Sequence, residues 1–326
     1  MSSTTFQPEI SIIIPIYKVE AFIERCAVSL FEQTADNCEF IFVDDCSPDN
    51  SIALLLNILN DYPHIKNRVK IIRHDKNLGL AGARITGLNN AQGEYVICCD
   101  SDDWVEPHMY KSLYEIAVRD DADIVICDYY INTKNKQTHI SQSISSNPNI
   151  LLNQTIRGEI HCGLWNKLVR REIFEKLSTT FIQGVNMWED VTVLLRLVYF
   201  ARKISNVPQP LYHYNQANSN AYTQLWKPLY TQNIIDVLTV NDNFFESCDV
   251  NITALWVRGF YSILYHTCKS QREKYLDILY QHVMKSQIDY TIFSLYQKIV
   301  AYALFNRYNL MADSLIFIKK VIGRFK

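Results

Sequence analysis

The sequence lacks a long apolar segment and any marked excess of charge of one sign. No stretch approaches the roughly 18 uncharged apolar residues that a helix needs to cross a bilayer. Lysine and arginine total 32, aspartate and glutamate total 34, and the formal net charge is −2, which argues against a protein that binds nucleic acid through charge. Residues 1–8 lack the charged start and apolar core of a signal peptide. We therefore expect a cytoplasmic protein, with the inner face of the cell membrane as a peripheral location.

Paired cysteines and glycine-rich phosphate loops are also missing. The nine cysteines include no Cys-x-x-Cys pair, and Cys98, Cys99 and Cys127 lie in apolar runs. This odd number argues against a disulfide framework or a zinc site, so we expect reduced thiols that pack as small hydrophobic groups. The chain contains neither GxGxxG nor GxxxxGK[ST], so the dinucleotide-binding and P-loop alternatives lose their best evidence.

What the N-terminal part does contain is an alternation of short apolar runs with segments of helical periodicity. The predicted strands cover residues 10–16, 40–43, 69–72, 95–99 and 124–127, and the predicted helices cover residues 19–31, 52–59, 80–88 and 109–118. Continuous apolar strands that alternate with helices are typical of a Rossmann-like, mostly parallel sheet with helices on both faces. We therefore predict an α/β fold.

The remaining residues divide into two parts. Residues 132–149 are polar and are predicted to form a loop or an exposed hairpin, and residues 165–174 and 191–200 are predicted to be amphipathic helices. After about residue 221 the segments are aromatic-rich and helical, with no strand pattern; they cover residues 234–245, 255–268 and 275–284. The sequence thus predicts a catalytic domain at 1–220 and a C-terminal helical extension at 221–326.

Acidic residues gather where the predicted strands end. In open α/β sheets the ligand binds outside the carboxyl ends of the strands. Asp44 and Asp45 follow the second strand, where carboxylates suit hydrogen bonds to a base or to ribose. Ser47 and Asp49, which come next, are equally well explained as helix caps.

A second acidic segment, Asp100-Ser101-Asp102-Asp103, follows the fourth strand. The Asp-x-Asp spacing offers two hard oxygen ligands for Mg²⁺ or Mn²⁺ bridging to a diphosphate. Such a metal would neutralise charge that develops on a leaving nucleotide. The alternative is an acidic turn before the helix that follows Pro107.

The starts of two further predicted helices carry charged side chains that could bind a ligand or take part in catalysis. Small residues between Asn77 and Arg84 permit a close backbone approach to phosphate, and Arg84 supplies a cation one turn into the helix. Tight packing of this helix on the sheet explains its alanines equally well. The Trp188-Glu189-Asp190 segment precedes an apolar helix, where acids are also ordinary partners of the helix dipole.

With these segments in this order, the chain resembles the family 2 glycosyltransferases, which are inverting enzymes with the GT-A nucleotide-diphospho-sugar transferase fold. The resemblance runs from Ile10 to about Ser219. The matching segments are Ile13 to Tyr17, Val43 to Asp49, Asn77-Leu78-Gly79, Ala83-Arg84, Gly93-Glu94-Tyr95, Asp100 to Asp103, Trp165 to Leu168, Glu189-Asp190 and Pro210 to Tyr214. The order and spacing of the segments together carry the resemblance.

The resemblance implies a role for each candidate residue. Nucleotide contacts are expected from Pro15, Tyr17, Asp44, Asp45, Asn77, Arg84 and Asp100, with Arg84 on the phosphates. The metal would be held by Asp102, with Asp100 and His213 as further ligands. Asp190 would be the general base that takes the proton of the acceptor hydroxyl, and Trp188 and Glu189 would contact the sugar or the acceptor.

Four positions depart from the family pattern. Lys18 stands where the family usually has Asn, Cys46 where it usually has Gly, and Ile85 where Asn commonly follows the arginine. Asn215 replaces a basic residue that is common after the Tyr-x-Tyr segment. None of these changes removes a carboxylate, so the resemblance still implies an active enzyme.

The resemblance predicts transfer of a hexosyl or N-acetylhexosaminyl group from a UDP-sugar to a carbohydrate or lipid-linked glycan in surface polysaccharide synthesis. A nucleotidyltransferase and a catalytically inactive sugar-binding scaffold of the same fold are the alternatives. The basic amphipathic segment 316–326 suits either peripheral contact with an anionic membrane or packing in the domain or in a homodimer.

Overall fold

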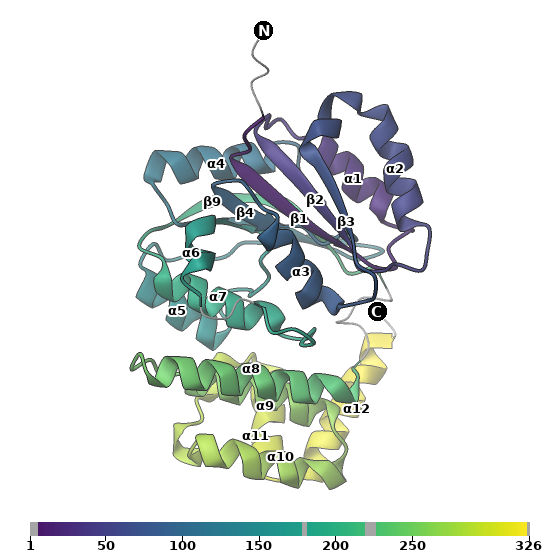
Figure 1. The fold of residues 1–326 in the computed structure, drawn as a ribbon. Helices are drawn as coiled ribbons and strands as arrows, with labels where there is room; N and C mark the ends of the chain where they lie inside the picture. Colours follow the sequence, from purple (N-terminus) through teal and green to yellow (C-terminus); the bar gives the residue numbers. More distant parts are fainter. Residues whose placement is uncertain (1–5, 178–180, 219–225, 325–326) are drawn as a thin grey trace. The chain divides into compact units, whose positions relative to one another are not determined.

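A computed structural model of the chain describes residues 6–177, 181–218 and 226–324. The chain divides into two compact units (Figure 1). The first comprises Met1–Leu152 and Cys162–Leu225, and the second comprises Asn153–His161 and Trp226–Lys326. The domain boundary predicted at 220/221 lies in 219–225, outside the described residues.

The first unit is built on a mixed, mostly parallel sheet, whose path within the described residues is β3-β2-β1-β4-β8-β6-β9-β5, with β7 paired to β6. The strands are β1 (Ile10–Ile16), β2 (Cys38–Asp44), β3 (Val69–Arg73), β4 (Tyr95–Cys98), β5 (Trp104–Val105), β6 (Ile124–Asn132), β7 (Gln137–Ile140), β8 (Lys167–Arg170) and β9 (Ile204–Asn215). Strands β1 to β4 are parallel, as are β6 and β9, whereas β8 runs antiparallel to both β4 and β6. The parallel sheet predicted from the sequence is thus confirmed.

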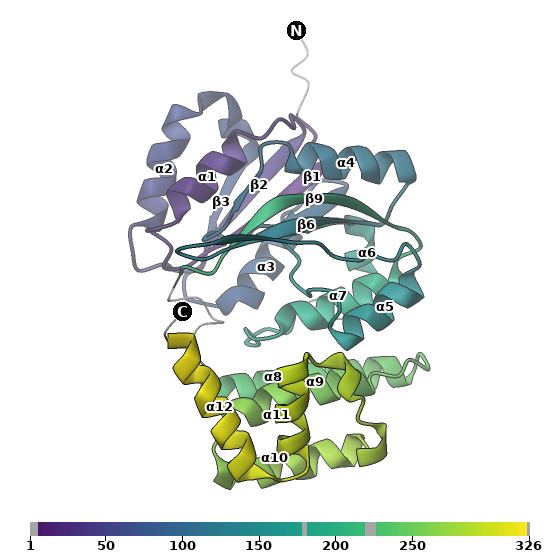
Figure 2. The same cartoon turned by 180° about the vertical axis from the view of Figure 1, so that it is seen from behind.

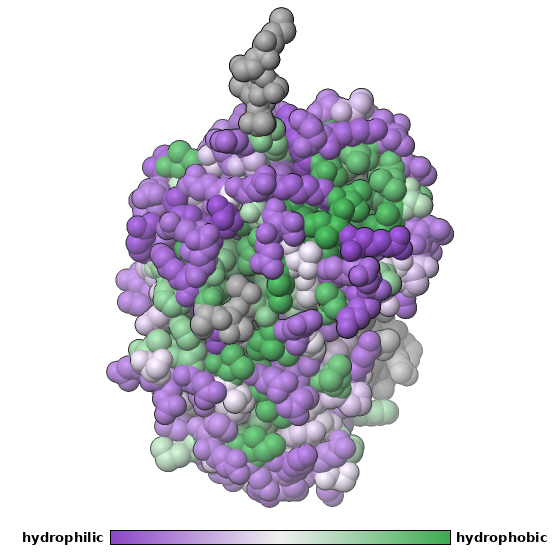
Figure 3. Space-filling view, in the orientation of Figure 1, coloured by the Kyte–Doolittle hydropathy of each residue, from purple (hydrophilic) through white to green (hydrophobic). Residues whose placement is uncertain are grey.

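Helices cover both faces of this sheet (Figures 1 and 2). Those of the first unit are α1 (Ile23–Phe31), α2 (Ser51–Asp61), α3 (Gly79–Asn89), α4 (Met109–Asp120), α6 (Arg171–Glu175) and α7 (Glu189–Phe200), with a 3-10 turn η1 (Pro63–Arg68); α5 (Pro148–Arg157) begins in the first unit and ends in the second. The main apolar core joins β1 to α1, α2 and α4, while α3 packs on the opposite face against β1 and β2. In the face shown in Figure 3, hydrophobic residues gather over α1 and α2 within an otherwise largely hydrophilic surface.

Strand β1 is buried along its whole length because both of its sides are covered. All seven of its residues are buried. Ile10, Ile12, Ile14 and Ile16 enter the main core. Ile13 points to the other face, where a Cβ on Gly87 of α3 would lie 2.3 Å from its Cγ2. The glycine therefore lets α3 lie directly on the strand that leads into the site.

The prediction of a single helix over residues 165–174 is wrong. Residues 167–170 form β8, and only 171–175 are helical. The residues of β8 pair with both β4 and β6, and such long-range hydrogen bonds override local helical periodicity. The helix predicted at 191–200 is confirmed as α7, and the polar segment 132–149 contains the predicted hairpin as the β6–β7 pair.

The second unit is helical in its described residues. Its elements are α8 (Pro228–Glu246), α9 (Thr253–His266), α10 (Lys269–His282), the 3-10 turns η2 (Lys285–Gln287) and η3 (Tyr290–Ile292), α11 (Leu295–Phe305) and α12 (Asn309–Arg324). Helix α9 packs against α8, α10 and α11 and supplies the fully buried Trp256 and Phe260. Among the described helices, none is both long and apolar enough to cross a bilayer.

Candidate active site

Three neighbouring strands end at the candidate site, because β2, β1 and β4 are adjacent in the sheet. Direct hydrogen bonds hold the loops that follow them together. The Lys18 amide donates to Ser47 Oγ at 2.8 Å, and Ser101 Oγ donates to the Pro15 carbonyl at 2.6 Å. Polar side chains in these loops are thus used first to fix the loops to one another.

The Asp100 to Asp103 segment alternates between outward and inward side chains. Asp100 and Asp102 are partly exposed, whereas Ser101 and Asp103 are buried. Asp103 accepts hydrogen bonds from Tyr212 Oη at 2.6 Å and from the Asn215 amide at 2.7 Å. The inward pair anchors the segment on β1 and β9, so the two outward carboxylates have fixed positions.

Strand β9 supplies further support for this segment. Tyr212 Oη also accepts from the Asp100 amide at 3.1 Å, so one buried hydroxyl bridges the backbone of Asp100 and the carboxylate of Asp103. Asn215 Nδ2 donates to the Asp102 carbonyl at 3.0 Å, and Asn218 Nδ2 donates to Asp102 Oδ2 at 2.7 Å. The Asp-x-Asp motif depends on residues more than a hundred positions later in the chain.

Arg84 is the centre of the site. Its side chain is 1% exposed, and its guanidinium reaches Asp100 Oδ1 at 2.9 Å and Glu189 Oε1 at 2.8 Å. It also donates to Asp190 Oδ1. One cation thus joins the end of β4 to the start of α7.

The acids around Arg84 outnumber the cation, and burial raises the pKa of two of them. Burial raises the pKa of Glu189, and the neighbouring Asp190 charge raises it further while Arg84 opposes both. Burial likewise raises the pKa of Asp190, again opposed by Arg84. Burial and the charge of Asp100 raise the pKa of Asp102 to about 6. The site therefore holds more negative charge than its own cations balance, and it favours an added cation.

Two features position Asp190. Trp188, the residue before α7, has a left-handed backbone with φ of 67°, an uncommon conformation for a bulky residue, and it turns the chain so that Glu189 and Asp190 open the helix. Lys167, buried in β8, donates to the Gly163 carbonyl at 2.6 Å and to Asn166 Oδ1 at 2.7 Å. Its positive charge lowers the pKa of Asp190.

Lys167, Tyr212 and Asn218 have structural roles in the site that were not predicted from their sequence context. Lys167 lies in the segment matched by resemblance, yet a buried lysine cannot be recognised from one sequence because lysine is almost always exposed. Tyr212 lies in the matched Pro210 to Tyr214 segment, which offered a signal for it. Nothing in the sequence around Asn218 marks it.

The nucleotide contact predicted for Asp45 is wrong. Asp45 is buried, and its two carboxylate oxygens accept the amides of Leu78 and Gly79 at 2.7 and 2.8 Å, with His74 Nδ1 at 2.8 Å. Asn77 Nδ2 donates to the Asp45 carbonyl at 3.1 Å. Asp45 therefore holds the start of α3, where the first amides of a helix need acceptors, and its carboxylate is not available to a nucleotide as predicted. Asn77 is exposed, and its predicted nucleotide contact stays a prediction.

The small residues that open α3 also have a structural partner. Gly79 has φ of +79°, and a Cβ there would lie 2.5 Å from Asn186 Oδ1. The sequence predicted that phosphate would approach the backbone here. In the structure, the side chain of Asn186, in the loop before α7, occupies the space beside Gly79. Arg84, assigned to phosphate by resemblance, instead faces three carboxylates of its own chain.

The residues predicted to hold the base and ribose lie where β1 and β2 end. Pro15 is buried, and Tyr17 is 37% exposed. Asp44 is buried, with Oδ1 accepting from the Ser47 amide at 2.8 Å and Oδ2 lying 3.2 Å from Arg73 Nε. Arg73 is itself 72% exposed, so it can move away from Asp44 at little cost.

His213 has a different setting from the one predicted. Its ring is stacked between Trp104 and Tyr130, with centroids at 4.7 and 4.9 Å. Nε2 lies 2.9 Å from Glu106 Oε1, and Nδ1 lies 3.4 Å from Asn132 Nδ2. Both ring nitrogens thus face groups of this chain, and we leave His213 out of the proposed metal set.

Asp100 and Asp102 fit a hard divalent cation in their chemistry. Each uses one carboxylate oxygen in a hydrogen bond from Arg84 or Asn218, and the pKa of Asp102 is raised first by burial and then by the charge of Asp100. Across residues 6–177, 181–218 and 226–324, no three His, Cys, Asp or Glu side chains meet as a complete metal site. A bound cation would need donors from a ligand such as a diphosphate, because Mg²⁺ keeps about six ligands.

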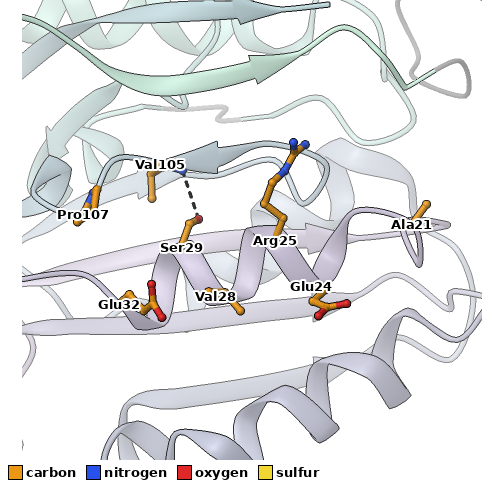
Figure 4. A pocket seen from close by; sticks show the side chains of 8 residues that line it. All are labelled: Ala21, Glu24, Arg25, Val28, Ser29, Glu32, Val105 and Pro107. Carbon is orange, nitrogen blue, oxygen red and sulfur yellow. Dashed lines mark hydrogen bonds between the residues drawn. The ribbon is translucent and has the colours of Figure 1, made fainter. Parts of the chain in front are cut away.

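A surface recess lies apart from these residues. It is lined by α1 and by the chain around Val105 and Pro107 (Figure 4). Glu24 and Arg25 point in opposite directions from α1, and the Arg25 guanidinium lies 3.4 Å from the centre of the Trp104 ring. None of the predicted site residues lines this recess.

Comparison with known proteins shows the family of this chain. Residues 11–178 match the model of the family described as Glycosyl transferase family 2. The chain belongs to this family. A Bacillus subtilis relative named EpsH is 34% identical over 230 residues, which are 68% of this chain and 65% of EpsH. This family 2 chain therefore matches just under two thirds of that relative.

Solved structures share the fold. The Staphylococcus aureus TarS fragment 1–349, crystallised with UDP-GlcNAc, has a TM-score of 0.72 at 16% identity, over 94% of this chain and 91% of that one. A mannosyltransferase from Pyrobaculum calidifontis, in complex with GDP-Man and Mn²⁺, has a TM-score of 0.51 at 16% identity, over 96% of this chain and 86% of that one. The predicted GT-A fold is confirmed.

Proposed function

We propose that this chain is an inverting glycosyltransferase that moves a hexosyl or N-acetylhexosaminyl group from a nucleotide-diphosphate sugar to a glycan acceptor. The observation that carries the proposal is the contact of Arg84 with both Asp190 and Asp100. Through this contact, the start of α7 and the Asp-x-Asp motif form one site at the carboxyl ends of the strands. A carboxylate base and a diphosphate-metal site are the two parts that an inverting transfer needs.

Asp190 is the proposed base. Its side chain is 17% exposed, so one face is open to an acceptor, while burial keeps its pKa above that of an exposed aspartate. A carboxylate of raised pKa is a stronger proton acceptor, provided that it stays ionised. Arg84 and Lys167 keep it ionised. In the proposed reaction, Asp190 takes the proton of the acceptor hydroxyl as that oxygen attacks the anomeric carbon and the nucleoside diphosphate leaves from the opposite face.

The donor is proposed to lie along the ends of β1, β2 and β4. Tyr17, Pro15 and Asp44 would contact the base and ribose, and Asp100 and Asp102 would hold Mn²⁺ or Mg²⁺. The metal would supply positive charge to the diphosphate as the bond to the sugar breaks. The UDP-GlcNAc of the TarS complex supports a UDP-sugar as the first donor to test, and the Mn²⁺ of the mannosyltransferase complex supports the metal.

Calorimetric titration with UDP, with and without Mn²⁺, tests the donor site. We expect binding that needs Mn²⁺ and that Asp102→Asn weakens strongly. Asp36→Asn is the matched control, because the Asp36 side chain is 97% exposed in the same unit. Failure of UDP to bind under all these conditions would refute the UDP-sugar donor, and the same titration with other nucleoside diphosphates would then show whether any nucleotide binds.

A turnover assay separates an enzyme from an inactive scaffold. Hydrolysis or transfer is measured for a panel of UDP-sugars with simple glycans and lipid-linked glycans as acceptors. We expect Asp190→Asn to lower turnover about a hundredfold or more while UDP affinity changes little. Equal turnover in Asp190→Asn and the wild type would remove Asp190 from the mechanism.

A further inference from the structure

Helix α12 has an apolar face on each side. Ala312 and Ile316 point into the second unit and are buried. On the other side, Leu310 is 78% exposed and Phe317 is 67% exposed. Met311 and Ile318 continue this second side, which we call the outer apolar face (Leu310, Met311, Phe317 and Ile318). The spacing of seven residues between Leu310 and Phe317, and again between Met311 and Ile318, places all four on one side of the helix.

The neighbouring helix extends the exposed apolar surface of this unit. Helices α11 and α12 pack against each other, and both are seen in Figure 2. On α11, Leu295 is 78% exposed, and Ile299 and Tyr302 follow it at positions four and seven, with exposures of 42% and 49%. Exposed apolar side chains that gather in this way mark a surface that binds something, since single scattered residues are what an ordinary surface shows.

The charge of the same segment is opposite to that of the rest of the chain. Residues 295–326 contain six basic residues and one acidic residue, a net charge of +5, whereas the other 294 residues contain 26 basic and 33 acidic residues, a net charge of −7. The acidic residue, Asp313, is paired with Arg272 at 2.7 Å, and of the basic residues Arg307 is paired with Glu273 and Asp277 on α10. Lys319 is exposed and lies 4.9 Å from the centre of the Tyr296 ring on α11. The segment that carries the outer apolar face is therefore more basic than the rest of the chain.

We propose that the outer apolar face docks on the surface of an anionic lipid bilayer. Apolar side chains on one side of a helix enter the boundary between headgroups and acyl chains when the helix lies in the plane of the membrane. Basic residues beside them gain attraction to anionic lipid headgroups. The inference does not depend on the proposed transferase activity.

The charge also favours a bilayer over a second copy of the chain as the occupant. A two-fold symmetric interface brings the same patch of both copies together, so it would place two segments of net charge +5 against each other. An anionic membrane instead offers charge of the opposite sign together with an apolar interior. Of these two occupants, the bilayer matches both the charge and the apolar side chains of the segment.

Flotation of the purified chain with lipid vesicles tests the proposal. One set of vesicles is phosphatidylcholine alone, and the other contains about a quarter phosphatidylglycerol. The face variant is Phe317→Ser with Ile318→Ser, and its matched control is Leu229→Ser on α8, a residue that is 58% exposed. The charge variant is Lys319→Glu, and its matched control is Lys274→Glu on α10, whose exposed ammonium lies 5.9 Å from the ring centre of Tyr275. Thermal unfolding checks that each variant is folded.

We expect the wild type to float with the anionic vesicles and not with the neutral ones, and to be released by salt. The face variant and the charge variant should each lower the partition coefficient about tenfold, and the two controls should change it less than about twofold. Absence of binding at low salt would overturn the proposal, as would equal losses in the variants and their controls. A dimer in solution that the face variant dissociates, without vesicle binding, would assign the face to a second copy instead.

Discussion

Replacement of Arg84 by methionine tests whether this residue is the counter-ion that holds the site together. Methionine has a similar unbranched stem, so the substitution removes mainly the charge and its hydrogen bonds. In the wild type the guanidinium contacts Asp100, Glu189 and Asp190. The variant leaves these three carboxylates without their shared cation.

The expected cost follows from how deeply the partners are buried. Removal of one partner of a buried ion pair typically costs about 3–5 kcal/mol, because the remaining charge stays desolvated. Glu189 and Asp190 are 8% and 17% exposed, whereas Asp100 is 25% exposed, so water offsets part of the loss. We therefore expect the free energy of unfolding to fall by about 3 kcal/mol, a large fraction of the stability of a typical domain.

The loss of unfolding free energy in Arg84→Met should also depend on pH. Without Arg84 the pKa values of Glu189 and Asp190, already raised by burial, rise further. A carboxyl group whose pKa is raised in the folded state favours folding below its unfolded pKa of about 4, and this stability is lost as the pH rises through the folded pKa. The difference between wild type and variant should therefore be larger at about pH 8 than at about pH 5.5.

Urea denaturation followed by circular dichroism at these two pH values measures both effects. The matched control is Arg170→Met, because Arg170 also contacts three carboxylates. Two of them, Glu94 and Asp121, are 52% and 80% exposed, and the third, Asp123, keeps a second arginine, Arg202. The control should thus lose about 1 kcal/mol or less. A loss for Arg84→Met that matches the control, or that does not change with pH, would refute the counter-ion argument.

Four further predictions follow from single contacts. Asp45→Ala should lower the free energy of unfolding by about 1–3 kcal/mol, because two amides of α3 lose their acceptor, yet UDP affinity measured by calorimetry should be unchanged. Cys46→Gly should raise the free energy of unfolding, measured in urea, by about 0.5–1 kcal/mol, since Cys46 has φ of 56° and glycine accepts this conformation without steric cost. Tyr212→Phe should lower the free energy of unfolding by about 1–3 kcal/mol, because its hydroxyl binds both the Asp100 amide and the Asp103 carboxylate. The rate of the wild type should rise with pH through the raised pKa of Asp190, which must be ionised to accept a proton, and Lys167→Met should move this rise to higher pH, as a pH–rate profile would show.

Apolar periodicity predicted most of the first unit and missed elements that depend on distant pairing. Each of strands β1 to β4 contains a short apolar run, so the pattern alone identified them. Strand β8 has four residues, too few for a period, and it exists because β4 and β6 pair with it. Helices α11 and α12 have apolar residues on both sides, so a pattern with one apolar stripe does not describe them.

The same limit explains why the partners of some site residues could not be predicted from the sequence. A polar residue after a strand can face a ligand or can serve the start of the next helix, and both uses favour the same residue types. The partners decide between them, and they lie far along the chain. Asp45 binds amides 33 and 34 residues later, and Arg84 meets Glu189 and Asp190 105 and 106 residues later.

The departures from the family pattern at Lys18 and Cys46 have a backbone explanation. Both residues have left-handed backbones, with φ of 55° and 56°. The family usually has Asn and Gly at these positions, and these are the residues that adopt this conformation at least cost. Here the conformation is kept by hydrogen bonds of the loops, since the Lys18 amide binds Ser47 Oγ and the Ser47 amide binds Asp44 Oδ1. The two substitutions therefore alter the stability of the strand-end loops and leave the carboxylates of the site in place, so we expect their effect in unfolding experiments and not in the chemistry of transfer.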